Sequence, residues 1–422
     1  MSATTHLFVD DVRIERKEGV VRRTHACSKL AEPVISGRES WQSPSDDERV
    51  YIYGTVLPSD DGEGYRMWYM RYPDQLLYAE SDDGIHWRRP DLGLVDIKGS
   101  IPNNLLPTSY HSPSLVCDCR EPDPALRYKM LGVSRDPDRR GYSVATSSDG
   151  IRWTPSDANP VLTGGDTCAL AQDPVTGQFL AFHKRYHEHR GQERRLVYLS
   201  TSDDFHDWSE PVLAMAPDDV DDAQTAAEGG CFSQFYNTAA FPCGDMWLGL
   251  VTHFRYSGAP PESGPDQSRH DGPIDVQLTC SRDGRTWSRL EDRSPVIPNG
   301  PHDYDAGGIL GVANAPVDAG DETWVYYTAI TTTHGGCTPR KKITIARAAW
   351  RRHGWVSLDA DASGGTVETK PVLADGQRLS VNTNALNGEL RAEILDTEGN
   401  PIPGYGLEAC LPIDGDGVRQ VV

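Results

Sequence analysis

The sequence lacks an apolar run long enough to cross a membrane, and its first residues show neither the basic nor the apolar segment of a secretory signal. Positive charge is also scarce. The chain has 41 Lys and Arg against 62 Asp and Glu, and its net charge is -21. Nucleic acid and anionic membranes are therefore not expected as partners. We expect a cytoplasmic protein that binds a neutral or weakly charged substrate.

Cysteine pairs with metal-site spacing are missing as well. The nine cysteines are odd in number and scattered, and Cys117 and Cys119 form the only close pair. We predict reduced structural thiols, no metal ligands and no cofactor. A structural calcium site is an open alternative, because calcium binds carboxylate and carbonyl oxygens. No loop, however, has a recognisable calcium-binding spacing.

A recurring seven-residue phrase organises what is present. It occupies residues 81–87, 147–153 and 281–287, with a looser copy at 202–208, and each copy follows an alternating, β-prone run. Its Asp can accept hydrogen bonds from N–H groups two residues on, its Gly tolerates positive φ, and its Trp can open the next strand. Four copies predict a repeat architecture, with the phrase serving a purely structural role at outer hairpins.

Around these phrases the chain forms five units with the same internal order. The predicted strands are 50–57, 65–69 and 76–80; 114–117 and 128–133; 167–171 and 179–182; 235–241 and 246–251; and 309–313, 324–327 and 343–346. Turn signals for four strands in each unit favour a five-bladed β-propeller over residues 1–365, with a sandwich or solenoid as the alternative. A leading strand at 7–14 is expected to join the last blade.

The pattern changes after the fifth unit. Alternating segments at 379–384 and 389–395, with a turn at 396–400, predict two further strands. We expect a small C-terminal β-sandwich over residues 366–422, either incomplete or completed by strands from elsewhere. The predicted fold class is thus all-β, a propeller with an appended sandwich.

Candidate catalytic groups come from the starts of the inner strands, which converge on a propeller axis. Asp166 and Asp305 each precede an inner strand and have small neighbours, and Glu228 is the candidate acid. Glycoside hydrolysis needs such a pair of carboxyl groups, one as acid and one as base or nucleophile. The alternatives are strand-start caps for the two aspartates and a solvated loop for Glu228.

Further polar and aromatic residues are candidates for substrate binding. These are His111, Gln234, Tyr236, Tyr53, His253, His334 and Lys184. The histidines could bind sugar hydroxyls, the tyrosines could stack on a sugar ring, and Lys184 could contact a substrate carboxylate. Structural histidines and core packing are the alternatives. Trp41 is a further stacking candidate, whereas Asp47 and Glu48 fit surface charge better.

Several segments carry a resemblance to a known group: residues 7–11, 53–57, 65–69, 78–87, 89–94, 272–277 and 354–359. In these the chain resembles the five-bladed glycoside hydrolases of families 32 and 43, and uncharacterised bacterial family-32-like proteins. The resemblance spans nearly the whole chain. It implies a propeller hydrolase acting on carbohydrate, with an appended β-sandwich.

The chain departs from family 32 in its motifs. The signature Trp-Met-Asn-Asp-Pro-Asn-Gly and a Glu-Cys pair are absent, and the Arg-Asp-Pro triplet at 135–137 sits in a polar turn. We predict a glycosidase that acts on an oligosaccharide or glycoside through paired carboxylates. The alternatives are a carbohydrate-binding propeller, a protein-interaction propeller, or a phosphorylase, which would need a basic cluster for phosphate. The sequence leaves the oligomeric state open.

Overall fold

The computed structural model describes residues 5–37, 48–97, 103–261, 263–265, 267–373 and 378–421. The chain divides into two compact units. The larger unit comprises Ala26–Val317 and Trp324–Ala349, and the smaller comprises Met1–His25, Asp318–Thr323 and Trp350–Val422. Each unit is described by itself. The predicted boundary between residues 365 and 366 stays a prediction.

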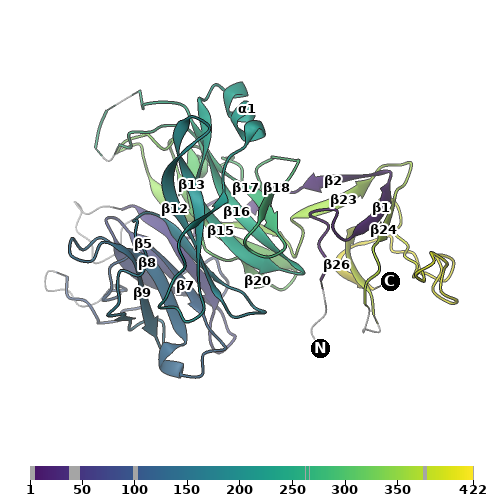
Figure 1. Cartoon of the computed structure of the whole chain (residues 1–422), viewed down its shortest axis with the longest axis horizontal. Coiled ribbons are helices and arrows are strands. Elements are labelled where there is room, and N and C mark those ends of the chain that lie inside the picture. Colours follow the sequence, from purple (N-terminus) through teal and green to yellow (C-terminus); the bar gives the residue numbers. More distant parts are fainter. Residues whose placement is uncertain are drawn as a thin grey trace. The chain divides into compact units, whose positions relative to one another are not determined.

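The larger unit consists of five antiparallel sheets, the blades of a β-propeller (Figure 1). Blade one is β4 (Val50–Pro58), β5 (Tyr65–Arg71) and β6 (Gln75–Ser81); blade two is β7 (His111–Cys117), β8 (Tyr128–Ser134), β9 (Gly141–Ser147) and β10 (Thr154–Pro155); blade three is β11 (Cys168–Gln172), β12 (Phe179–His189), β13 (Gln192–Ser202) and β14 (Val212–Met215). Blade four is β15 (Phe232–Cys243), β16 (Met246–Tyr256), β17 (Ile274–Ser281) and β18 (Trp287–Arg289); blade five is β19 (Gly308–Val312), β21 (Glu322–Ile330) and β22 (Ile343–Arg351), with β20 (Val317–Ala319) beside β21.

The first strands of the five blades form the inner ring. Neighbouring strands touch in the order β4, β7, β11, β15 and β19, and β19 returns to β4. Alternating apolar side chains fill the spaces between neighbouring blades, so the core is a set of clusters around the ring rather than one central core. The predicted five-bladed propeller is confirmed, and the starts of the inner strands do converge.

Two copies of the repeated phrase are hydrogen-bonded to the neighbouring blade. In the copies at 81–87 and 147–153, the Asp accepts hydrogen bonds from the N–H groups two and three residues on. The carbonyl of the phrase's Gly then accepts a bond from an aromatic side chain of the preceding blade: Tyr326 Oη donates to Gly84 at 2.8 Å and Trp68 Nε1 to Gly150 at 2.6 Å. The phrase is therefore a structural repeat, as predicted.

The ring is completed by a segment from near the start of the chain, although not by the predicted one. β3 (Ser28–Lys29) pairs with β22 in blade five, with Ser28 opposite Ala349. Residues 7–13 form turns instead of a strand. Asp10 accepts a hydrogen bond from the Val12 N–H, and the Asp11 carbonyl accepts one from Ile14 N. These turn bonds satisfy the backbone locally and delay the first strand to Ile14.

In its described residues, the smaller unit contains three two-stranded sheets. β1 (Ile14–Glu18) pairs with β24 (Thr366–Thr369), β2 (Val20–Thr24) with β23 (Val356–Ala360), and β25 (Ser380–Asn384) with β26 (Asp416–Val421). The predicted strand at 379–384 is confirmed. The one at 389–395 is wrong, because in this segment only Leu390 and Leu395 form isolated bridges. The Ile394 side chain is 47% exposed, so it adds little packing to hold this stretch extended.

Helices are few in the described residues. They are η1 (Pro124–Leu126), α1 (Asp219–Ala227) and η2 (Asp303–Asp305). None of them has the length and apolar character that a membrane-spanning helix requires.

Candidate functional site

An ion pair between blade three's first two strands lies at the centre of the site. Asp166 lies two residues before the inner strand β11, and Lys184 lies on the neighbouring β12. Lys184 Nζ is 3.0 Å from Asp166 Oδ1 and 3.7 Å from the ring centroid of Tyr236, which belongs to β15 of blade four. The Asp166 side chain is 33% exposed, whereas that of Lys184 is 2% exposed. The Asp166 carboxylate is thus partly exposed to solvent, and the Lys184 ammonium group that it contacts is buried.

Two further blades contribute to the same place. Tyr53 lies on β4 and His111 begins β7, and their ring centroids are 6.0 Å apart. Burial raises the pKa of Tyr53 most strongly, and a hydrogen bond to Tyr236 adds to the effect. We call Tyr53, His111, Asp166, Lys184 and Tyr236 the axial cluster. It draws on four of the five blades, as expected for residues where inner strands converge.

The electrostatics of the cluster keep its carboxylate ionised. Burial acts to raise the pKa of Asp166, but the charge and hydrogen bond of Lys184, and the charge of His111, outweigh it and lower the pKa. Burial and the nearby Arg195 lower the pKa of Lys184 to about 8, against the opposing effect of Asp166. At neutral pH the two groups form a carboxylate–ammonium pair.

His111 is oriented by a residue that the sequence did not single out. Its Nδ1 lies 2.8 Å from Asp74 Oδ1, and Arg135 Nε is 3.3 Å from Asp74 Oδ2. Beside this group lies a cavity of about 380 Å³, lined by Asp74, Ser109, Val133, Ser134, Arg135 and Asp136. With Nδ1 engaged by Asp74, His111 keeps Nε2 for other partners.

A buried arginine also lies near Tyr236. Arg195, on β13, is 3% exposed. It donates from Nη1 to Gln234 Oε1 at 2.9 Å, and its Nη2 is 3.0 Å from His270 Nδ1. Its guanidinium carbon lies 5.5 Å from the Tyr236 ring centroid. Gln234 is therefore connected to the axial cluster through Arg195, which sequence reasoning missed.

His334 also borders this side of the cluster. Its ring centroid is 5.1 Å from that of Tyr236, and its Nδ1 is 2.9 Å from the His270 carbonyl oxygen. Burial lowers the pKa of His334 to about 3, so the ring is neutral at neutral pH. A neutral Nδ1 beside a carbonyl must carry the hydrogen, which leaves Nε2 as an acceptor.

The structure places Asp305 in a closed environment. Its side chain is 0% exposed, and its Oδ2 accepts hydrogen bonds from Lys29 Nζ at 2.6 Å and Tyr327 Oη at 2.9 Å. Lys29 also donates to the Gly300 carbonyl at 2.6 Å. These contacts tie β3 to the segment before β19. Asp305 has no surface for a substrate in this structure, and its catalytic role stays a prediction.

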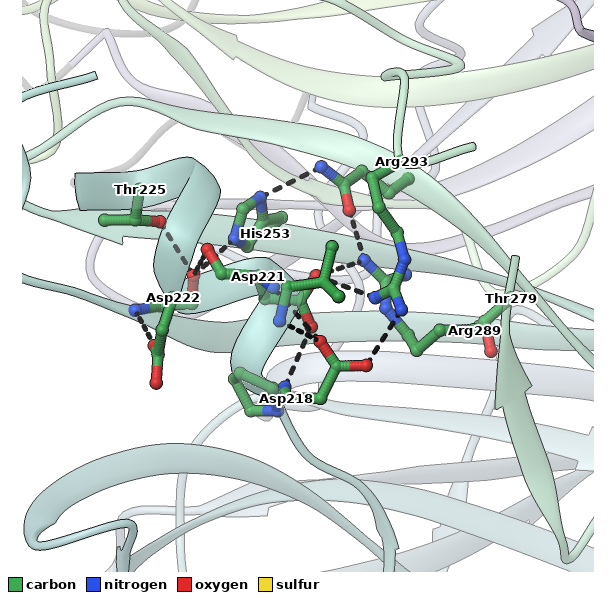
Figure 2. Close-up of polar contacts among 12 residues, drawn as sticks. Asp218, Asp221, Asp222, Thr225, His253, Thr279, Arg289 and Arg293 are labelled. Carbon is green, nitrogen blue, oxygen red and sulfur yellow. Dashed lines mark hydrogen bonds and ion pairs between the residues drawn. The ribbon is translucent and has the colours of Figure 1, made fainter. Parts of the chain in front are cut away.

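Glu228 and His253 belong to a different network, around helix α1. Asp218 caps the helix by accepting bonds from Val220 N and Asp221 N, and Glu228 ends it. The Glu228 carboxylate is 48% exposed and pairs with Arg255 Nε at 2.9 Å. His253 is 0% exposed, with Nε2 2.8 Å from Ser233 Oγ and Nδ1 3.0 Å from Gln277 Nε2 (Figure 2). These described contacts do not include the axial cluster.

Trp41 and Asp47 lie outside the described residues, and Glu48 is exposed. Within the described part of the chain, no three or more His, Cys, Asp and Glu side chains are grouped so as to hold a metal ion. The missed residues Asp74 and Arg195 gave little signal in the sequence. Asp74 follows β5 in a turn, and Arg195 is one of several charged residues at the start of β13.

No protein-family model matches the chain. Over 103 residues it is 34% identical to uncharacterized proteins from two strains of Mycobacterium tuberculosis, covering 22% of this chain. The matched stretch spans about 30% of the length of those curated relatives.

Solved structures share the fold. An N-acetylgalactosamine deacetylase from F. plautii, in complex with blood group B trisaccharide, superposes with a TM-score of 0.50 at 15% identity, over 79% of this chain and 96% of that one. A glycosyl hydrolase from Bacteroides ovatus gives 0.48 at 14% identity, over 77% and 94%. A family 32 β-fructofuranosidase from Bombyx mori gives 0.43 at 12% identity, over 86% and 69%. Glycoside hydrolases are thus among the solved structures similar to this chain, and the likeness to the deacetylase, at 15% identity, shows the fold alone.

Proposed function

We propose that this protein is a hydrolase that acts on glycosides, with the axial cluster as its active site. The observation that carries the proposal is the partly exposed, ionised carboxylate of Asp166, set among aromatic rings from several blades at the starts of the inner strands. Aromatic faces with a few convergent polar groups are typical of sugar sites. The resemblance to five-bladed glycoside hydrolases supports the same substrate class.

Asp166 suits the role of base or nucleophile. Glycoside hydrolysis needs a group that stays ionised on one face of the sugar and a proton donor for the leaving oxygen. Lys184 holds Asp166 in the ionised form, which a base or nucleophile requires.

His111 is the proton donor that this geometry favours over Glu228, the acid expected from the sequence, which pairs with Arg255, and over Asp305. Its Nδ1 is held by Asp74, so its Nε2 can exchange a proton with the substrate, and its charge acts on Asp166. Asp305, by contrast, is enclosed by Lys29 and Tyr327. The structural neighbour from F. plautii is a deacetylase, so the fold by itself does not define the bond that is cleaved.

The test is a hydrolysis screen over aryl glycosides and oligosaccharides with Asp166→Asn and His111→Gln beside the wild type. Each substitution should lower kcat by about 10²–10⁴-fold, the range for removing a general acid or base. Asp82→Asn is the matched control because its side chain is 84% exposed in an outer hairpin. A wild type that cleaves a glycoside at a rate unchanged by Asp166→Asn would overturn the assignment. No cleavage, with sugars raising the melting temperature, would instead indicate a binding module.

A further inference from the structure

Arg195 is a buried cation without a carboxylate partner in the described chain. Its side chain is 3% exposed, and both partners of its terminal nitrogens, Gln234 and His270, are neutral groups at neutral pH. Its Nε is buried and has no hydrogen-bond partner among the described residues. Glu193 is exposed two positions earlier on the same strand and forms no described ion pair with it. Enclosing an uncompensated guanidinium is unfavourable unless another charge balances it.

Three aromatic rings lie close to the Arg195 guanidinium, and one of them, Tyr236, belongs to the axial cluster. The guanidinium carbon of Arg195 is 5.2 Å from the ring centroids of Tyr186 and Phe254, and 5.5 Å from that of Tyr236. Lys184 also contacts Tyr236, since its Nζ is 3.7 Å from the ring centroid. Two cations therefore lie near one ring. Tyr186 is 45% exposed, so this side of the cluster reaches solvent.

The charges at this place do not cancel. Lys184 is paired with Asp166, and Arg195 is left over, so the three groups sum to one positive charge. On the blade-two side, by contrast, Asp74 faces both His111 and Arg135. A ligand with one negative charge would bring the Lys184 and Arg195 side to neutrality, whereas a phosphate dianion would overshoot it.

We propose that the axial cluster takes a sugar bearing a carboxylate, a uronic acid or uronide, with the carboxylate on the Lys184 and Arg195 side of Tyr236. This rests on the proposed function for the active site and names the substrate class of that same site. The overall charge of -21 repels an anionic substrate, so the local positive charge of Lys184 and Arg195 would have to admit it. The neutral sugar of the same ring form should bind more weakly.

The experiment compares matched substrates. The kcat/KM values are measured for 4-nitrophenyl β-glucuronide against β-glucoside, and for α-galacturonide against α-galactoside. In parallel, the melting temperature is measured with free glucuronate, galacturonate, glucose and galactose at equal ionic strength. Acetate and inorganic phosphate serve as anions without a sugar. Lys184→Met, Lys184→Arg and Arg195→Lys are tested beside the wild type, with Arg152→Gln as control because its side chain is 72% exposed.

The expected result is a preference for the uronide or uronate, which Lys184→Met reduces by about 10–100-fold, the size expected for losing a charge-assisted hydrogen bond. Lys184→Arg and Arg152→Gln should keep the preference. The ratio between acidic and neutral sugar is the decisive readout, because a merely structural role for Lys184 would lower both values alike. Arg195→Lys keeps the charge in case the loss of Arg195 prevents folding.

The other outcomes separate this inference from the proposed function. Equal or better use of the neutral sugar would retain the glycosidase and refute the uronate. An equal effect of acetate or phosphate would indicate an unspecific anion site. If no glycoside is cleaved, a rise in melting temperature with uronate alone, absent in Lys184→Met, would keep the acidic sugar as ligand while the hydrolase fails. No rise with uronate would refute the inference whatever the protein hydrolyses.

Discussion

Asp221 offers the sharpest test of how the propeller is held together around α1. Its side chain is fully buried in the first turn of the helix, where Oδ1 accepts bonds from Arg289 Nη2 at 2.8 Å and Arg293 Nη1 at 2.9 Å (Figure 2). Its Oδ2 accepts a bond from Asp218 N at 3.0 Å, which completes the capping box. Asp221→Asn keeps the size of the side chain and removes its charge.

The expected loss follows from the partners that remain. Arg289 is 10% exposed at its side chain and has no other carboxylate partner in the described chain, whereas Arg293 also pairs with Asp218. Removing one member of a buried ion pair typically costs about 3–5 kcal/mol because it leaves an uncompensated charge. Since Arg293 keeps a partner, we expect a loss of about 3 kcal/mol in the free energy of unfolding.

The assay is urea unfolding followed by tryptophan fluorescence, with Asp219→Asn as matched control. Asp219 occupies the same helical turn, but its side chain is 85% exposed, so its substitution should cost at most about 1 kcal/mol. Adding Arg289→Met to Asp221→Asn should recover part of the loss, because it removes the unpaired buried cation. Equal losses for the two single variants, or no recovery in the double variant, would refute the reasoning.

Three further predictions concern packing and pH. Gly150→Ala should lower the free energy of unfolding by roughly 1–3 kcal/mol, since φ is +76° and a Cβ would lie 2.6 Å from Trp68. The control Gly191→Ala has φ +75° but no atom within 4 Å, so it should cost only about 1 kcal/mol. Similar losses for the two variants in urea unfolding would contradict the packing argument. Burial lowers the pKa of His183 to about 3, so below about pH 6.5 the unfolded chain binds a proton that the folded chain does not. The free energy of unfolding should therefore fall by about 1.4 kcal/mol per pH unit as the pH drops, and His183→Gln should remove this contribution. Parallel curves for variant and wild type would rule out the role of His183. Burial lowers the pKa of Lys184 to about 8, so its amino group is charged below that pH and neutral above it. The rise in melting temperature caused by galacturonate should therefore fade as the pH passes about 8 in the wild type and persist in Lys184→Arg. A rise that stays constant in the wild type would argue against the role of Lys184.

The fold was readable from the sequence wherever local chemistry repeats. In the copies that contain both residues, the Asp and Gly of the phrase form their own turn, as the hydrogen bonds of Asp83 and Asp149 show. The alternating runs between phrases form the blades. Errors arose where the same alternation occurs without a partner. Residues 7–13 alternate like a strand, yet Asp10 and Asp11 close turns, and the segment at 389–395 finds only isolated bridges.

The site was readable only in part, for a physical reason. The starts of inner strands had to converge, which brought Asp166, His111 and the two tyrosines of the cluster together. Whether a carboxylate is open or sealed depends on partners far along the chain. Asp305 is enclosed by Lys29, 276 positions away, and no local pattern announces that pairing. Arg195 escaped notice for the same reason, since its neighbours come from distant parts of the chain.

The pairing of β3 with β22 has a consequence for how the protein is made. Ser28 and Lys29 leave the ribosome early, but the strand that they complete is synthesised only after all the other blades. Domains generally fold as their chains emerge, so this short segment must wait while the inner strands assemble. The last blade then gains its outer edge, and Lys29 reaches Asp305, in one late event that joins both ends of the ring. A nascent chain stalled before residue 343 would hold four complete blades and a fifth blade that lacks β22, and this open edge could pair with other chains.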